Sequence, residues 1–353
     1  MKLTARTQDD VPHAKQTPTC NRCVCERERR REQFFAEMRS KRGRESGLES
    51  ADAVHNIGEG THGTVFKATH SDGTLVALKK FKARDGISTS AYREMSILQG
   101  LDDHPHVVKL LEVRTAPPLT LVFEYVTGDL SKRIRSLKKA GSHFEAFTIC
   151  SLVRQLLSGL QHIHAQGIMH RDVKPANLLL SAEGLLKLAD FGLARRFDAP
   201  LRPIGLDGQV VTAWYRAPEV LFGAPTHGPE VDLWSAGCIL CELHTLRPLF
   251  PGKVEEGCGA QRDQMLHLLR LLGLPEQDAV QTWSLWPAIS QEAATLPATD
   301  DLGAHLARAC PSAAAKPNPD ACRLISELLQ WDPTKRISAD AALAMRSYFS
   351  SAE

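Results

Sequence analysis

The chain has 353 residues, of which 43% are hydrophobic and 24% charged, and its formal net charge is +2. This length and apolar content suit one large domain or one domain of two lobes, and the near-neutral charge argues against direct nucleic-acid binding. Nine cysteines, most of them isolated, favour reduced thiols over a disulfide framework. Because no apolar run is long enough to span a membrane and no signal peptide is recognisable, we expect a soluble intracellular protein without membrane contact.

Residues 1–50 form a basic N-terminal extension, with 12 Lys and Arg against 8 Asp and Glu. Residues 26–38 (ERERRREQFFAEM) contain strong helix formers without Gly or Pro, which predicts a short helix. Three thiols gather just before it, but three ligands without a second pair rarely make a structural zinc site; they are Cys20, Cys23 and Cys25. The basic run at residues 39–44 is typical of a nuclear import sequence or of a solvated linker.

Beyond the extension, the apolar residues follow the spacings of packed strands and helices. Residues 75–80 and 119–125 predict two strands. Residues 144–166 and 231–246 have the spacing of long helices, and Gly167 is a suitable end for the first of them.

The order of these elements indicates the fold class. The Pro and Ala cluster at residues 287–319 predicts a long irregular connection. Because strands gather in the first half and helices in the second, we expect an α+β fold of two lobes. The domain then covers residues 51–349, with a small β-rich N-lobe at about 51–126 and a larger helical C-lobe at about 127–349.

A glycine-rich loop near the start of the domain has the pattern G-x-G-x-x-G-x-V. Its members are Gly58, Glu59, Gly60, Thr61, His62, Gly63 and Val65. Glycines let the backbone approach phosphates closely, and the valine would cover a flat base, although such a pattern alone is often only a turn. The case for a phosphate-binding loop is stronger because Lys79 follows in a predicted strand, from which a lysine can reach the α- and β-phosphates of a nucleotide.

Residues 170–177 (HRDVKPAN) carry the strongest chemical pattern. Phosphoryl transfer needs a carboxylate that orients the attacking hydroxyl and accepts its proton, and Asp172 fits this role. Lys174 can neutralise charge on the moving phosphoryl group, and Asn177 supplies a neutral oxygen to a cation. Asp190, in the sequence Asp-Phe-Gly, adds a carboxylate suited to a hard cation such as Mg²⁺.

Taken in order and closed by Ala-Pro-Glu at residues 217–219, these motifs resemble those of eukaryotic protein kinases, over residues 57–349. The resemblance implies a Ser/Thr kinase that uses ATP and Mg²⁺, with Asn177 and Asp190 as metal ligands. It also implies that Glu94 pairs with Lys79, and that the nucleotide site includes further residues: Ile57, Ala77, Phe123, Glu124 and Val126 (the last two through their backbones), and Asp129 near the ribose.

The resemblance assigns structural roles as well. Glu219 would pair with Arg336, while Asp232 and Trp234 would brace the catalytic loop. A pseudokinase is the alternative within this fold, but no catalytic position is missing from the sequence.

Several segments are similar to the cyclin-dependent kinases. Residues 210–216 (VVTAWYR) resemble the part that selects proline after the target residue, and Thr212 would bond near Asp172. Residues 88–94 stand at the cyclin-binding helix and are similar to the version in Mediator-associated kinases that pair with cyclin C. Residues 26–38 resemble the N-terminal helix that contacts cyclin C, and residues 250–264 an insertion of the same subgroup.

This resemblance implies a nuclear, proline-directed kinase in transcription regulation, acting on the RNA polymerase II tail or on transcription factors. Its partners would be a cyclin, of the cyclin C type, and the Mediator complex. Two alternatives stay open: a cyclin-dependent kinase of cell-cycle or ciliary type, and a non-catalytic scaffold that binds a cyclin. Retention of Lys79 and Asp172 counts against the scaffold.

The activation segment lacks a phosphorylatable residue where relatives place a phosphothreonine between three arginines, here Arg93, Arg171 and Arg195. Clustered guanidinium groups need an anion. Asp207 could supply it, so that activation needs a cyclin but no activating kinase. Alternatively, Asp207 points to solvent, and an acidic residue of the cyclin supplies the anion to the three arginines. His62 replaces an inhibitory tyrosine of the cell-cycle enzymes, so that switch should be absent, although Thr61 could still be modified.

Overall fold

The computed structural model describes residues 55–60, 63–70, 72–82, 88–197, 213–252, 260–293, 295 and 302–350. All of them belong to the unit Ala51–Glu353. Several predictions therefore lie outside the described residues: the helix at 26–38, the basic run at 39–44, most of the insertion at 250–264, and the side chains of Cys20, Cys23, Cys25, Thr61, His62, Asp207 and Thr212.

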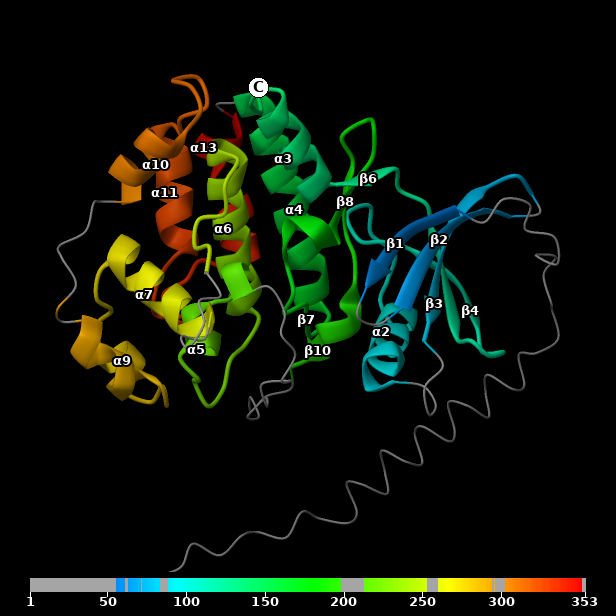
Figure 1. Cartoon of the computed structure of the whole chain (residues 1–353), viewed down its shortest axis with the longest axis horizontal. Helices are drawn as coiled ribbons and strands as arrows, with labels where there is room; N and C mark the ends of the chain where they lie inside the picture. Colours follow the sequence, from blue (N-terminus) through cyan, green and yellow to red (C-terminus); the bar gives the residue numbers. More distant parts are fainter. Residues whose placement is uncertain are drawn as a thin grey trace, which may run out of the picture. The chain divides into compact units, whose positions relative to one another are not determined.

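A five-stranded antiparallel sheet forms the N-terminal part of this unit (Figure 1). Its spatial order is β1-β2-β3-β5-β4, with β1 (His55–Gly60), β2 (Gly63–Thr69), β3 (Leu75–Phe81), β4 (Leu110–Arg114) and β5 (Thr120–Glu124). Alternation along the strands brings apolar residues to one buried cluster of Ala68, Val76, Leu78 and Val122. Helix α2 (Thr89–Gln99) follows β3, and the Ser88 hydroxyl caps it by accepting a hydrogen bond from the Ala91 N–H at 3.1 Å.

The C-terminal part of the unit is helical. Its helices are α3 (Leu130–Lys139), α4 (Ala146–Ala165), α5 (Pro218–Leu221), α6 (Glu230–Thr245), α7 (Ala260–Leu272), α8 (Gln277–Val280), α9 (Trp286–Ala293), α10 (Leu302–Ala309), α11 (Pro319–Leu328), α12 (Ala339–Leu343) and α13 (Arg346–Ser350). Helix α6 is central, because every residue after Glu230 is buried on all sides of the helix. None of the described helices is both long and apolar enough to cross a membrane.

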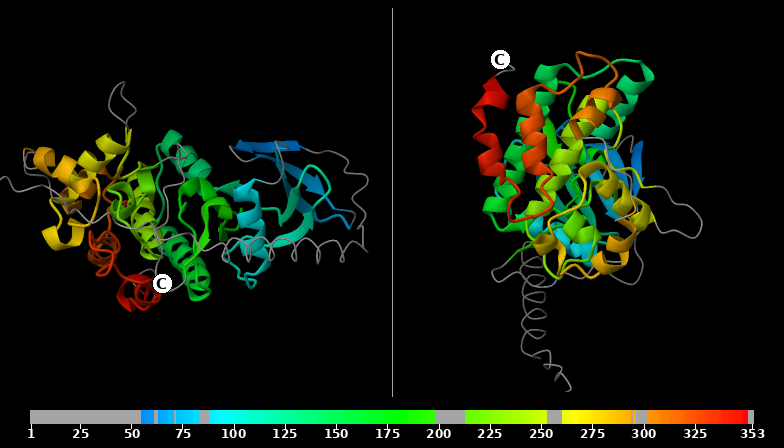
Figure 2. Two further views of the ribbon diagram at one scale, coloured as in Figure 1. Left: turned by 90° about the horizontal axis from the view of Figure 1, so that it is seen from below. Right: turned by 90° about the vertical axis from the view of Figure 1, so that its left-hand side faces the viewer.

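Short strands lie between these two parts, as Figures 1 and 2 both show. Strands β6 (Gly128–Asp129), β8 (Leu178–Leu180) and β9 (Leu186–Leu188) form one small sheet, and β7 (Ile168–Met169) pairs with β10 (Arg195–Arg196). The segment before β4 packs tightly on α4 at Gly159, where a Cβ atom would lie 2.7 Å from the His106 carbonyl oxygen. This contact requires glycine.

The α+β fold of two lobes is confirmed, and so are the four predicted elements. They correspond to β3, β5, α4 and α6, and Gly167 does end α4 with a positive φ of 71°. The irregular connection at residues 287–319 was wrong in part, because α9 begins at Trp286 and α10 covers Leu302–Ala309. Pro287 lies in the first turn of α9, where proline is tolerated, and the alanines that follow are strong helix formers.

Candidate active site

A cavity of about 390 Å³ lies between the N-terminal sheet and the strands β8 and β9. Most of the residues predicted for the nucleotide site or for catalysis line it: Ile57, Gly63, Val65, Ala77, Lys79, Glu94, Phe123, Glu124, Val126, Asp172, Lys174, Asn177 and Asp190. Residues that are far apart in the sequence, from both lobes, therefore meet at one cavity.

Lys79 lies at the centre of a buried charge cluster. Strand β3 presents its ammonium group to the Glu94 carboxylate of α2, with Nζ to Oε distances of 2.7 and 2.8 Å, and to Asp190 Oδ1 at 2.9 Å. Burial disfavours the cation, but the attraction of Glu94 and Asp190 outweighs it and raises the pKa of Lys79. Burial raises the pKa of Glu94 to about 7, so a fall in pH through this value neutralises its carboxylate.

Apolar side chains line the part of the cavity where the sequence places a base. Val65, Ala77 and Phe123 belong to the N-terminal sheet, on β2, β3 and β5. Leu179 of β8 also lines the cavity, although its sequence gave no sign of this; the further unpredicted lining residues are Val108, Ala176, Ala189, Gly192 and Leu193. A strand of three residues such as β8 is too short to give a recognisable periodicity.

Glu124 contacts Lys109 through both its backbone and its side chain. Its N–H donates to the Lys109 carbonyl at 3.2 Å, so this donor is already used within the protein. The Glu124 side chain accepts from the Lys109 N–H at 2.8 Å and pairs with Lys187 at 2.9 Å. Strand β5 is thereby fixed to its neighbour at the edge of the cavity.

The glycine-rich loop reaches the cavity mainly through Ile57, Gly63 and Val65. Gly63 begins β2, and a Cβ atom there would lie 2.3 Å from the Lys80 carbonyl oxygen, so only glycine fits. Gly58 and Gly60 belong to β1, and Glu59 forms an exposed pair with Lys82 at 3.2 Å. Of these, Gly58 and Glu59 do not line the cavity.

Asp172 is held by two neighbours on its own loop. Its Oδ2 atom accepts hydrogen bonds from Lys174 Nζ at 2.8 Å and from Asn177 Nδ2 at 2.9 Å. A short 3₁₀ turn, Pro175–Asn177, brings Asn177 back to Asp172. Oδ1 accepts no hydrogen bond from another residue that the structure describes, so it is the oxygen left for an incoming hydroxyl.

The loop is anchored from α6. The buried Asp232 carboxylate accepts the backbone N–H groups of His170 and Arg171, both at 2.8 Å, and contacts His164 Nε2 at 2.9 Å. Burial would raise the pKa of Asp232, but the hydrogen bonds from His164 and His170 hold it below its usual value. Arg171 has a φ of 67°, a conformation that side chains rarely adopt, and these hydrogen bonds hold it there.

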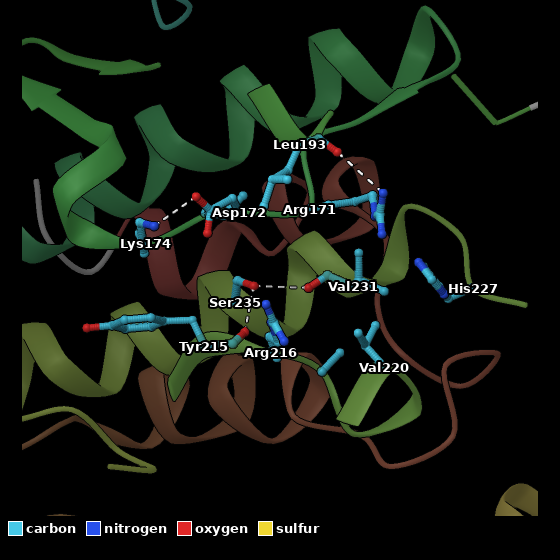
Figure 3. Close-up of a pocket in the computed structure, with 12 residues that line it drawn as sticks. Arg171, Asp172, Lys174, Leu193, Tyr215, Arg216, Val220, His227, Val231 and Ser235 are labelled. Carbon is cyan, nitrogen blue, oxygen red and sulfur yellow. Dashed lines mark hydrogen bonds and ion pairs between the residues drawn. The ribbon is translucent and has the colours of Figure 1, made fainter. Parts of the chain in front are cut away.

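A second cavity, of about 60 Å³, lies on the other side of Asp172. Figure 3 shows Lys174, Asp172 and Arg171 along one wall, and Tyr215, Ser235 and Arg216 along the other. Tyr215 donates to the buried Glu242 at 2.6 Å, and Ser235 donates to the Tyr215 carbonyl at 2.8 Å, which fixes this second wall.

Other predicted residues take the following places. The Asp129 carboxylate caps α3 by accepting the Lys132 N–H at 2.8 Å, and it lines a different groove. Arg93 and Arg171 donate to the carbonyls of Gly192 and Leu193, at 2.9 and 3.5 Å. The predicted pair of Glu219 and Arg336 is confirmed, with distances of 2.7 and 3.0 Å. Trp234 stacks on Phe250 and lies under the Arg336 guanidinium.

Comparisons with known proteins agree with this geometry. Residues 52–349 match the family model described as protein kinase domain. The chain is 38% identical over 317 residues to the cell division control protein 2 homolog D of Antirrhinum majus, covering 87% of this chain and 96% of the relative. It is 40% identical over 309 residues to the probable cyclin-dependent kinase 8 of Dictyostelium discoideum, covering 82% of this chain and 78% of the relative.

Proposed function

Because the chain belongs to the protein kinase family, and to its cyclin-dependent branch, we propose that it transfers the γ-phosphate of ATP to serine or threonine hydroxyls of proteins. One observation carries this proposal: Asp172 and Lys174 line both the larger cavity and the smaller one beside it. A nucleotide in the first and a substrate side chain at the second would meet at these two residues.

In this mechanism the Asp172 carboxylate acts as the base. Lys174 and Asn177 fix Oδ2, so Oδ1 accepts the proton of the attacking hydroxyl. Lys174 then neutralises charge that develops on the transferred group, because its ammonium group lies 2.8 Å from Asp172. Lys79, held by Glu94, contacts the phosphates that stay with the nucleotide.

The residues present fit a divalent metal ion. Asn177 commits its amide nitrogen to Asp172, which leaves its amide oxygen as the atom to face a cation. Asp190 lines the same cavity with a carboxylate, and carboxylate and amide oxygens are ligands of hard cations such as Mg²⁺. Such an ion would neutralise phosphate charge. Lys79 sets the position of Asp190 through its 2.9 Å contact.

Within the cyclin-dependent branch, we propose that the chain is a proline-directed kinase of the Mediator-associated type, paired with a cyclin C and located in the nucleus. It rests on the sequence of residues 88–94 and 26–38 and on VVTAWYR at 210–216. The name of the Antirrhinum relative favours a second candidate, a kinase of cell division. Both candidates share the same chemistry and differ in the cyclin.

Phosphate transfer from ATP and Mg²⁺ to a Ser-Pro repeat peptide tests the proposal, with and without purified cyclin C. We expect transfer only with cyclin C, without prior phosphorylation, and a loss of about 10²–10⁴-fold in Asp172→Asn, which keeps the size of the side chain. Transfer only with a cell-division cyclin would select the second candidate. Equal transfer by the wild type and Asp172→Asn would overturn the catalytic proposal itself.

A further inference from the structure

Two donors of helix α2 converge on one carbonyl group in the turn that follows Asp190. The Ser90 hydroxyl donates to the Gly192 carbonyl oxygen at 3.1 Å, and Arg93 Nη1 donates to the same oxygen at 2.9 Å. A Cβ atom at residue 192 would lie 2.8 Å from Ser90 Oγ, so a side chain there would displace the hydroxyl. Glycine at this position therefore leaves room for the hydrogen bond.

The two donors lie on the same face of α2 as Glu94. Residues 90, 93 and 94 are three and four positions apart, so their side chains stand next to one another on the helix. Glu94 holds Lys79, and Lys79 contacts Asp190 Oδ1 at 2.9 Å. One face of α2 thus holds the Asp190 carboxylate through a lysine, and the carbonyl two residues later through direct hydrogen bonds.

The backbone just before Asp190 is held by the helical lobe instead. The Ala189 N–H donates to the Asn177 carbonyl at 2.9 Å, and His170 Nε2 contacts the Ala189 carbonyl at 3.0 Å. Asp190 itself has a φ of 65°, a conformation that costs free energy in a residue other than glycine. Asp190 therefore lies between an anchor from the helical lobe and an anchor from α2, and its backbone needs both.

The Ser90 hydroxyl has no part in capping α2. Ser88 is the N-cap residue and accepts the Ala91 N–H. Serine also favours a helix less than alanine does, so helix stability does not explain a serine at position 90. A short side chain on a rigid helix fixes a carbonyl more closely than the long side chain of Arg93, which has more rotamers to order.

We propose that Ser90 is a positioning residue for metal-dependent nucleotide binding: its hydroxyl fixes the Gly192 carbonyl and so holds the Asp190 carboxylate towards the cavity. This inference rests on the proposed function, in which Asp190 and Asn177 hold Mg²⁺ beside the nucleotide. Loss of the hydroxyl removes one of the two hydrogen bonds to Gly192 and weakens the anchor that follows Asp190.

Binding can be measured without turnover, on the full chain carrying Asp172→Asn. The probe is a fluorescent, non-hydrolysable ATP analogue, followed by anisotropy in EDTA and in saturating Mg²⁺; the ratio of the two Kd values is the gain in affinity due to the metal. We expect Ser90→Ala to reduce this gain roughly three- to tenfold, as for the loss of one hydrogen bond, and to leave the Kd in EDTA unchanged.

Two variants serve as controls. Ser90→Thr keeps the hydroxyl and should keep the gain of the parent. Ser96→Ala removes a hydroxyl from the same helix, and Ser96 Oγ is buried without a hydrogen-bond partner in the described part of the chain; this variant should also bind like the parent.

An equal loss in Ser96→Ala, or in Ser90→Thr, would assign the effect to the packing of α2 and overturn the proposal. The same Ser90→Ala, Ser90→Thr and Ser96→Ala changes in the wild-type background are then assayed for phosphate transfer at increasing Mg²⁺. Transfer by the wild type together with an unchanged metal gain in Ser90→Ala sinks the positioning role alone. A reduced metal gain in Ser90→Ala, without transfer by the wild type with any cyclin, sinks the kinase proposal alone.

Discussion

Removing the Arg336 guanidinium group should strongly destabilise the helical lobe. All five of its N–H groups are used: two donate to the Glu219 carboxylate at 2.7 and 3.0 Å, and the others reach the carbonyls of Glu230 and Gln330 at 2.9 to 3.2 Å. The Arg336 and Glu219 side chains are 0% and 1% exposed. Breaking a buried pair from one side costs about 3–5 kcal/mol, because the remaining charge is left without a partner.

We therefore expect Arg336→Met to lower the free energy of unfolding by about 4 kcal/mol, and the melting temperature by roughly 8–16 °C. Calorimetry and urea unfolding followed by circular dichroism measure both quantities. The double variant Arg336→Met/Glu219→Leu removes both charges and should lose about 2 kcal/mol less than the sum of the two single variants. Additive losses, or a loss below about 1 kcal/mol as for a surface pair, would refute this reasoning.

Three further predictions concern pH and the catalytic loop. Lowering the pH through about 7 should reduce kcat/KM for ATP, because Glu94 becomes neutral and releases Lys79. The Glu94→Gln variant should lack this acidic limb of the pH profile. A variant with the same pH profile as the wild type would contradict the assignment of the limb to Glu94. His227 should lower the stability by about 2 kcal/mol between pH 7 and 5, because burial lowers its pKa to about 4 and only the unfolded chain binds its proton near pH 6. Circular dichroism melts measure this contribution as the pH-dependent change of the wild type minus that of His227→Gln, since the raised pKa of Glu94 acts in the opposite direction in both proteins; an equal change in both would argue against it. Asp232→Asn should lower kcat about tenfold with little change in nucleotide affinity. The reason is that one amide oxygen replaces two carboxylate oxygens that each accept a backbone N–H. A kcat equal to that of the wild type, measured in stopped assays, would exclude a role for Asp232 in positioning the catalytic loop.

The catalytic loop was the most predictable part of the site. Asp172, Lys174 and Asn177 lie within six residues of one another, so a single short turn brings them together. The meeting of Lys79 with Asp190, which are 111 residues apart, could not be derived from spacing. The resemblance to a known family placed both residues at the nucleotide site, but their direct contact was not predicted.

Other features depend on contacts that no local pattern contains. The Asp129 carboxylate caps α3 and pairs with Lys132, a contact that the sequence pattern did not predict. Leu179 lies in a strand of three residues, too short for an alternating pattern. Residues 287–319 contain enough proline to predict a connection, yet α9 and α10 form there because no proline lies in the interior of either helix and Pro287 stands in a first turn, where it is tolerated.

The backbone of the site shows why motifs alone are insufficient. Arg171 and Asp190 both have positive φ angles, 67° and 65°, although neither is glycine. Such conformations cost free energy, and distant partners stabilise them here: Asp232 of α6 binds the Arg171 N–H, and Lys79 of β3 binds the Asp190 carboxylate. A chain could keep His-Arg-Asp and Asp-Phe-Gly unchanged and still lose the geometry if either partner were replaced. The chemistry of the two motifs therefore depends on one buried carboxylate and one buried cation, each supplied by a different lobe.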